Sequence, residues 1–258
     1  MTKIVVLVKE VPDSYGERRL DLTTGLVDRN TGEQVLDEIS ARAAEFAVSH
    51  AESAQDVEVT LLAMGPASTS STLRKALSMG ADGACLVADE ALKGADLTLS
   101  AEVMAAALRH IGFDLVVTGD ESSDGATGMF PAMLAEHLGV PHLTSLETVE
   151  VNAGQISGDR AGLGGILSLN AALPAVISIT ERFPDPRYPS FKGIMSAKKK
   201  PLETLSLADL GVAPESDGPR SILVSVSESP PRGGGEKVTD DGEAGRRLAD
   251  FLRQNRLV

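Results

Sequence analysis

The sequence predicts an α/β fold built on a doubly wound, mostly parallel β-sheet. Short apolar runs alternate along the chain with longer stretches whose apolar residues recur at helical spacing. The first run, IVVLV at residues 4–8, is apolar at every position, as a strand buried on both faces requires. Strands that alternate with helices form parallel sheets with right-handed crossovers, so this order predicts a sheet between two layers of helices.

The elements alternate regularly as far as residue 138. Strands are predicted at residues 4–8, 57–62, 84–87 and 114–118. Helices are predicted at residues 41–51, 69–79, 97–111 and 128–138. The residues that follow three of these helices are glycines, as is common at helix ends: Gly80, Gly112 and Gly139.

The pattern changes beyond residue 143. Residues 144–151 and 164–170 alternate without a long helix between them, which predicts an antiparallel excursion before the buried strand 175–179. The remaining predictions are a short element at 206–210, a strand at 222–226, linkers at 213–219 and 229–235, and a helix at 244–255. We therefore predict an α/β domain over residues 1–212 and a C-terminal extension over residues 213–258.

Composition limits the functions that this chain can have. It has 258 residues, a formal net charge of −13 and 42% hydrophobic residues, but no Trp. An acidic chain lacks the basic face that nucleic-acid binding requires, so we exclude that partner. No run approaches the ~18 apolar residues of a membrane span, and none resembles a secretory signal. The lone Cys85 lies in an apolar run and is expected to be buried, which fits a reducing, cytoplasmic setting.

A polar loop, GDESSDGAT at residues 119–127, follows a predicted strand and precedes a predicted helix. Ligands of parallel sheets bind at the carboxyl ends of the strands, and a helix N-terminus offers free N–H groups to a phosphate. The loop contains neither Lys nor Arg, so it is not a Walker A motif. Its acidic residues would repel a triphosphate, so we predict that backbone amides hold a monophosphate. An ordinary helix-capping loop is the alternative.

The sequence predicts no catalytic or metal centre. The four histidines are scattered, without the spacing of a metal site, and no G-x-S-x-G motif occurs. The GLGG at residues 162–165 does not match G-x-G-x-x-G and is interpreted as a turn. The chain therefore has the features of a binding and docking protein and lacks those of a self-sufficient enzyme.

A proline-rich loop follows the predicted strand 175–179, within the run LPAVISITERFPDPRYPSFKGIMSAKKKP at residues 173–201. Tyr188 and Phe191 are predicted to be exposed in it. Proline restricts the conformations of a loop, so presenting an aromatic side chain there costs less ordering entropy on binding. This pattern is typical of a docking loop, and the alternative is that Phe191 packs into the core.

The order of motifs closely resembles that of electron transfer flavoprotein β subunits over residues 3–212. The matching motifs are VKEVPD at residues 8–13, MGPA at 64–67, LSMGAD at 77–82, the run 173–201, and DLGV at 209–212. The resemblance implies a flavodoxin-like domain, similar to adenine-nucleotide α-hydrolase-like domains. It also implies that residues 182–200 form the recognition loop that contacts a partner dehydrogenase.

The resemblance further implies cofactors and partners. In that family an α subunit supplies most contacts to one FAD at the subunit interface, and the β subunit holds a structural AMP. The heterodimer accepts electrons from acyl-CoA and related dehydrogenases, as in fatty acid oxidation, and passes them to a quinone oxidoreductase. A cytoplasmic heterodimer that does not insert into the membrane is therefore expected.

Site residues follow from the same resemblance. The implied AMP contacts are Leu7, Asp37, Ile39, Ser40, Ala63, Met64, Gly119, Ser122, Ser123, Asp124, Gly125, Ala126, Thr127 and Gly128. Tyr15, or the adjacent Ser14, lies where a β-subunit aromatic side chain approaches the flavin. The implied docking residues are Tyr188, Phe191, Ile194 and Met195. Residues 213–258 are expected to pack on the α subunit.

Two alternatives remain open from the sequence. One is a bifurcating electron transfer flavoprotein, in which the β subunit carries a second FAD in place of AMP. The other is a stand-alone protein that binds adenine nucleotides as a regulator or an adenylating enzyme. The lack of basic residues in the polar loop counts against the adenylating enzyme.

Overall fold

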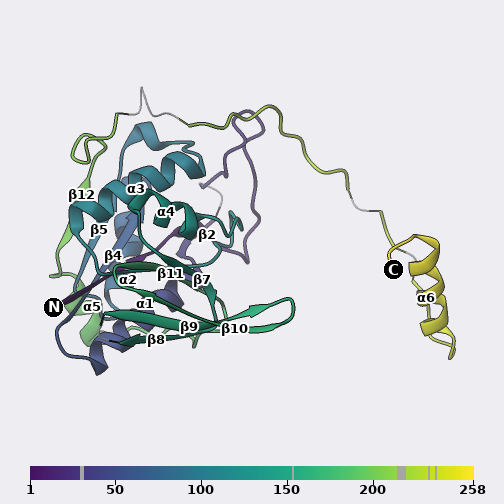
Figure 1. Ribbon diagram of the computed structural model, residues 1–258. Coiled ribbons are helices and arrows are strands. Elements are labelled where there is room, and N and C mark those ends of the chain that lie inside the picture. Colours follow the sequence, from purple (N-terminus) through teal and green to yellow (C-terminus); the bar gives the residue numbers. More distant parts are fainter. Residues whose placement is uncertain (30–31, 153, 214–218, 232, 236) are drawn as a thin grey trace. The chain divides into compact units, whose positions relative to one another are not determined.

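The computed structural model describes residues 1–29, 32–152, 154–213, 219–231, 233–235 and 237–258 (Figure 1). The chain divides into two compact units, Met1–Val224 and Ser225–Val258. Within the described residues, the larger unit contains every strand, and the smaller one contains a single helix, α6 (Ala244–Gln254). The predicted linker at residues 213–219 falls mostly outside the described residues.

Seven strands form the central sheet in the order β12-β5-β4-β1-β6-β11-β7, and every neighbouring pair is parallel. The strands are β1 (Thr2–Leu7), β4 (Val57–Met64), β5 (Gly83–Val87), β6 (Leu115–Gly119), β7 (His142–Leu146), β11 (Ala175–Ile179) and β12 (Leu202–Leu205). The chain winds outward from β1 through β4 and β5, then begins again at β6 on the other side of β1. Strand order therefore reverses between β1 and β6, which confirms the doubly wound sheet.

Helices cover both faces of this sheet (Figure 1). One face packs against α1 (Glu38–Ser53) and α2 (Ser70–Leu77), and a 3₁₀ turn, η1 (Ala67–Thr69), precedes α2. The other face packs against α3 (Leu97–Ile111) and α4 (Phe130–Leu138), and a second 3₁₀ turn, η2 (Glu90–Leu92), precedes α3.

The buried side chains of β1 explain its unbroken apolar run. Ile4 and Val6 belong to the core beneath α1 and α2, whereas Val5 and Leu7 belong to the core beneath α3 and α4. Alternate side chains of a strand point to opposite faces, so a strand covered on both faces must be apolar throughout.

The antiparallel excursion has a different make-up from the prediction. It is a three-stranded sheet of β8 (Thr148–Asn152), β9 (Gln155–Gly162) and β10 (Gly165–Ala172), in the order β10-β9-β8. β9 was not predicted, because its many polar residues obscure the two-residue alternation of a strand. The prediction also treated β7 and β8 as one segment. Ser145 has a φ of +55°, and the chain leaves the parallel sheet just beyond it. The predicted turn at residues 162–165 is confirmed as the β9–β10 connection.

Several short elements escaped the prediction. A small hairpin joins β2 (Glu10–Pro12) to β3 (Gln34–Leu36), and α5 (Phe191–Ala197) lies inside the proline-rich run. The short element predicted at 206–210 is a turn. The strand predicted at 222–226 is wrong, because these residues belong to none of the described strands.

Candidate nucleotide cavity and docking segment

A cavity of about 210 Å³ opens at the carboxyl ends of β1, β4 and β6, where strand order reverses. Its wall combines apolar side chains from the sheet and from α3 with polar groups of the loop that follows β6. The residues that line it are Leu7, Val8, Lys9, Ser40, Met64, Leu97, Ser100, Met104, Thr118, Gly119, Asp120, Glu121, Ser122, Gly125, Thr127 and Phe130.

The implied nucleotide residues divide into those that line this cavity and those that do not. The residues in the wall are Leu7, Ser40, Met64, Gly119, Ser122, Gly125 and Thr127. The residues outside the wall are Asp37, Ile39, Ala63, Ser123, Asp124, Ala126 and Gly128. Within the second set, Asp37, Ser123 and Asp124 make hydrogen bonds that hold the loop in place. Tyr15 lies outside the wall and is 99% exposed.

Asp37 joins the polar loop to α1. Its Oδ2 accepts hydrogen bonds from the backbone N–H and the hydroxyl of Ser40, each at 3.1 Å, and so caps the helix. Its Oδ1 accepts a bond of 2.9 Å from the backbone N–H of Ser123. Because the residue is only 2% exposed, both carboxylate oxygens depend on these partners. Arg18 adds a hydrogen bond of 2.5 Å to the Ser123 carbonyl.

The backbone of the loop is tightly constrained. A Cβ at Gly119 would lie 3.0 Å from Cγ2 of Ile39, so this glycine allows α1 to approach the end of β6. Ala126 has a φ of +44° and Gly128 a φ of +62°, both in the left-handed region. Left-handed backbone at a residue other than glycine is held only by surrounding contacts, and such positions cluster at ligand sites.

Two basic side chains from outside the loop offset its acidity. Lys9 Nζ lies 2.7 Å from Asp124 Oδ1 and 3.0 Å from Ser122 Oγ, and Arg29 Nη2 lies 3.4 Å from Asp124 Oδ2. Burial would raise the pKa of Asp124, but the hydrogen bond from Lys9, the bond from Ser122 and the charge of Arg29 hold that pKa below its ordinary value. The loop itself lacks Lys and Arg, yet its folded surroundings are not purely acidic.

Two acidic residues, Asp120 and Glu121, also line the cavity. Burial raises the pKa of Asp120 above its ordinary value, and the charges of Glu121 and Glu181 add to that rise. A Cβ at Gly128 would lie 3.3 Å from Oε1 of Glu121, so this carboxylate lies near the start of α4. The lining thus combines the cation of Lys9 with the carboxyl groups of Asp120 and Glu121.

The first turn of α4 is available to a ligand. Its N-cap residue, Met129, makes no side-chain hydrogen bond to the helix, and Pro131 lies in the first turn. The first N–H groups of a helix have no acceptor within it, and they carry a partial positive charge. The predicted helix began at Gly128, but the left-handed φ of that glycine delays α4 to Phe130.

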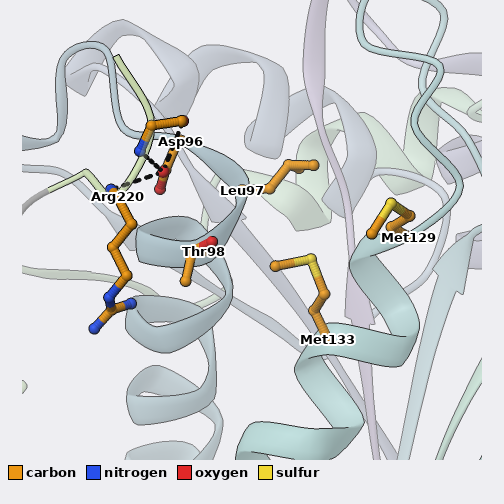
Figure 2. Close-up of a pocket in the computed structure, with 7 residues that line it drawn as sticks. Asp96, Leu97, Thr98, Met129, Met133 and Arg220 are labelled. Atoms are coloured by element: carbon orange, nitrogen blue, oxygen red, sulfur yellow. Dashed lines mark hydrogen bonds between the residues drawn. The ribbon is translucent and has the colours of Figure 1, made fainter.

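A second hollow of about 300 Å³ lies beside the cavity and shares Leu97 with it. Figure 2 shows Met129 and Met133 from the α4 side facing Leu97 and Thr98 at the start of α3. The chain at residues 220–221 closes one edge, because both backbone N–H groups donate to Asp96 Oδ2 at 2.8 Å.

The segment 182–200, which we call the docking segment, begins with an apolar contact to α1. Phe183 is buried and packs edge-on against Phe46 of α1, with ring centroids 5.6 Å apart and an interplanar angle of 86°. This contact fixes the point at which the segment leaves β11 and crosses the helix.

Two arginines then hold the docking segment on α1. Arg187 Nε lies 2.8 Å from Glu45 Oε2, and Arg187 Nη1 lies 2.6 Å from Glu52 Oε1. Arg42 of α1 donates to the Phe183 carbonyl and lies 2.6 Å from Asp185 Oδ1. Paired donors of a guanidinium fix orientation as well as distance, so the loop has little freedom here.

The far end of the docking segment is held against α2. A Cβ at Gly193 in α5 would lie 2.4 Å from the Ser78 carbonyl oxygen, so only glycine permits this close approach. Arg74 Nη1 donates to the carbonyls of Ala197 and Lys200 at 2.8 and 2.6 Å. Lys200 Nζ in turn donates to the Gly80 carbonyl at 2.9 Å.

The side chains between these two anchors face outward. Tyr188 is 97% and Phe191 81% exposed, and Ile194 and Met195 of α5 are also exposed. The prediction of exposed aromatics is therefore confirmed, and the alternative of a core position for Phe191 is wrong.

Comparison with known proteins identifies the family. A family model described as "Electron transfer flavoprotein domain" matches residues 24–210. An electron transfer flavoprotein subunit beta of Mycobacterium tuberculosis (strain ATCC 25618 / H37Rv) is 43% identical over 266 residues, covering 100% of both chains. This chain belongs to the electron transfer flavoprotein β-subunit family. Its role is electron transfer as part of a flavoprotein, which agrees with the absence of a predicted catalytic centre.

Other members of this family match over nearly the same length. The subunit beta of Mycobacterium leprae (strain TN) is 42% identical over 267 residues, covering 100% of both chains. The "Caffeyl-CoA reductase-Etf complex subunit CarD" of Acetobacterium woodii is 31% identical over 262 residues, which cover 99% of this chain and 100% of that protein. The family thus includes a subunit named as part of a reductase complex.

Part of the cavity wall in this electron transfer flavoprotein β-family chain was not predicted from its sequence. Lys9 lies in the VKEVPD motif and directly after the first strand, but neither feature by itself indicates ligand binding. Leu97, Ser100 and Met104 of α3 were also missed. They could have been found only from the rule that a helix following a parallel strand begins at the carboxyl edge of the sheet.

Three further features bear on the chemistry of the chain. Cys85 is buried as predicted, and burial, with a smaller effect from the charge of Glu203, raises the pKa of its thiol to about 12. Such a thiol is unreactive at neutral pH.

In the part of the chain that the structure describes, no helix is both long and apolar enough to cross a bilayer. The same residues contain no cluster of three or more His, Cys, Asp or Glu side chains suited to a metal ion.

Proposed function

We propose that this chain is the β subunit of a cytoplasmic, heterodimeric electron transfer flavoprotein that pairs with an α subunit. The heterodimer would accept electrons from acyl-CoA or related dehydrogenases and pass them to a quinone oxidoreductase. The docking segment carries the proposal, because Tyr188 and Phe191 face outward from a loop that α1 and α2 hold at both ends. A loop that is ordered before binding loses less entropy when a partner docks.

AMP is the proposed ligand of the cavity in this subunit. Leu7, Met64 and Met104 offer apolar contacts to a base, while Lys9 and Thr127 offer polar groups to a phosphate or ribose. The volume of about 210 Å³ lies below the range of about 300–1,000 Å³ that is typical of pockets for larger ligands. The composition and size of the cavity therefore support a mononucleotide.

FAD, held mostly by the α subunit, supplies the redox chemistry when it is bound. The proposed contribution of this chain is Tyr15, whose ring is exposed while its backbone N–H donates to Asp13 Oδ1 at 2.9 Å. The proposed second contact is α6, which places Leu248, Phe251 and Leu252 at helical spacing. An amphipathic helix with no buried residues is suited to packing on a partner subunit.

The test is copurification with the candidate α subunit, followed by counting FAD and AMP per complex. The proposal predicts one FAD and one AMP per heterodimer. A monomer that forms no complex with any α subunit and carries no flavin would contradict the proposal and favour a stand-alone nucleotide-binding regulator.

A bifurcating flavoprotein is the second candidate, with another FAD in place of AMP. The hollow beside Leu97 favours it, because a ligand larger than AMP could extend from the cavity into those further 300 Å³ (Figure 2). One relative also belongs, by name, to a reductase complex. Two FAD molecules and no AMP per heterodimer would establish this candidate over the first.

A further inference from the structure

We propose that Lys9 is the phosphate-binding cation of the cavity and makes it prefer a nucleoside monophosphate to the nucleoside. The inference rests on the proposed AMP site and adds the residue that sets its preference. It follows from the position of one side chain, the charges that line the cavity and the hydrogen-bonding capacity of an ammonium group.

Lys9 extends from the end of β1 to the polar loop, where a phosphate would bind. Its Nζ lies 3.0 Å from Ser122 Oγ and would lie 3.6 Å from a Cβ placed on Gly125. Both of these loop residues line the cavity together with Lys9. The side chain is 42% exposed, so its amine can meet a ligand without leaving the loop.

An ammonium group has three N–H donors. Two of those of Lys9 point to Asp124 Oδ1 and Ser122 Oγ, at 2.7 and 3.0 Å. The third is available to a phosphate oxygen. Arg29 also lies on Asp124, at 3.4 Å, so Asp124 keeps a cationic partner when Lys9 shares its charge with a ligand.

The charged residues in the cavity wall make Lys9 the group that determines phosphate binding. Among the described residues that line the cavity, Lys9 is the one basic residue, and Asp120 and Glu121 are the acidic ones. Arg18 and Arg29 contact the loop but do not line the cavity. A monophosphate beside Lys9 would gain a charge-assisted hydrogen bond, whereas a longer phosphate chain would meet the two carboxylates. The wall therefore favours one phosphate group.

The test measures the affinities of the heterodimer, freed of bound nucleotide, for AMP and for adenosine by calorimetry. Lys9→Met keeps the length and apolar stem of the side chain but removes its charge. We expect AMP affinity to fall about tenfold to a hundredfold, as the loss of a charge-assisted hydrogen bond predicts, with adenosine affinity unchanged. Lys93→Met is the matched control, because Lys93 is exposed and does not line the cavity, and we expect it to leave both affinities within about twofold.

Further variants and conditions separate charge from structure. Lys9→Arg should keep the preference for AMP, and added salt should weaken AMP binding to the wild-type protein but not adenosine binding. The salt measurement needs no variant and so tests the inference even if Lys9→Met fails to fold.

Three results would overturn the inference. Unchanged AMP affinity in Lys9→Met would show that Lys9 does not bind the phosphate. An equal loss of AMP and adenosine affinity would assign Lys9 a structural role only. A wild-type heterodimer that binds neither compound would instead refute the AMP site itself, and the inference with it.

Discussion

The polar loop at residues 119–128 and the docking segment at residues 182–200 present their side chains in opposite directions, although both are fixed by residues distant in sequence. The first turns its polar groups inward to line a cavity, and the second presents Tyr188 and Phe191 to solvent. Both loops depend on contacts beyond their own hydrogen bonds. Residues far away in sequence fix each one, through Asp37 and Lys9 for the first and through α1 and α2 for the second.

The difference between them lies in the contacts that hold them. The polar loop depends on buried hydrogen bonds and one paired carboxylate, whereas the docking segment depends on partly exposed arginine pairs and a close glycine approach. Removing a buried hydrogen-bond partner leaves donors unsatisfied and costs more than removing an exposed ion pair. We therefore expect substitutions at the polar loop to affect folding, and substitutions at the docking segment to affect partner binding.

Asp37→Ala should have the largest effect on stability. It removes the cap of α1 and leaves the buried N–H of Ser123 without its acceptor, so the free energy of unfolding should fall by about 2–4 kcal/mol. Bound nucleotide should fall as well. Urea unfolding and nucleotide extraction measure both. Asp37→Asn is the control: it can keep the cap of α1 but not the bond from Ser123, so it should lose about half as much stability. No loss of stability in Asp37→Asn would contradict the tie to Ser123.

Phe191→Ala should separate docking from folding. The side chain is exposed on a fixed loop, so its removal should slow electron transfer from a reduced acyl-CoA dehydrogenase about 30-fold, as expected for a binding hot spot. The melting temperature should not change, and stopped-flow kinetics measure the rate. The control is Leu163→Ala, another exposed apolar residue, at the β9–β10 turn. Equal rates for Phe191→Ala and wild type would refute the docking role.

Arg187→Met tests how much the anchoring of the docking segment matters. It removes the paired contacts to Glu45 and Glu52 but leaves Phe191 in the chain. We expect a loss of about 1–2 kcal/mol in stability and about a fivefold slower electron transfer, because the loop must then be ordered on binding. The matched control is Arg182→Met, whose pair with Glu147 is more exposed and should matter less. Equal effects would mean that anchoring at α1 is unimportant.

The same contrast explains which features the sequence could predict. The strands and helices of the parallel sheet follow from local patterns, so IVVLV at residues 4–8 and the helix at residues 97–111 were predictable. The exposure of Phe191 also followed from its proline-rich surroundings. The pairs Lys9–Asp124 and Arg187–Glu45 join residues more than 100 positions apart, so no local pattern encodes them. The strand wrongly predicted at 222–226 is the converse case: its apolar residues favour a strand locally, but a strand also requires a pairing partner that the local sequence does not specify.

The smallest expected effect tests the charges within the polar loop. Burial raises the pKa of Asp120 above that of the unfolded chain, so its ionisation opposes folding. Protonation of Asp120 therefore stabilises the folded protein. This stabilisation is fully present at low pH and is lost as the pH rises through the raised pKa of Asp120. Asp120→Asn should therefore be slightly more stable than wild type at pH 7, and the difference should vanish below the ordinary aspartate pKa of about 4.

Asp124→Asn should behave in the opposite way, which makes it the matched comparison for Asp120→Asn. The pKa of Asp124 is lowered in the folded protein, so its charge contributes stability above the ordinary aspartate pKa and loses that contribution as the pH falls through the lowered value. The variant should be less stable than wild type at pH 7. Urea unfolding at pH 7 and pH 4 distinguishes the two. If both substitutions shifted stability in the same direction at pH 7, the contrast between a buried Asp120 and an Asp124 stabilised by Lys9 and Arg29 would be wrong.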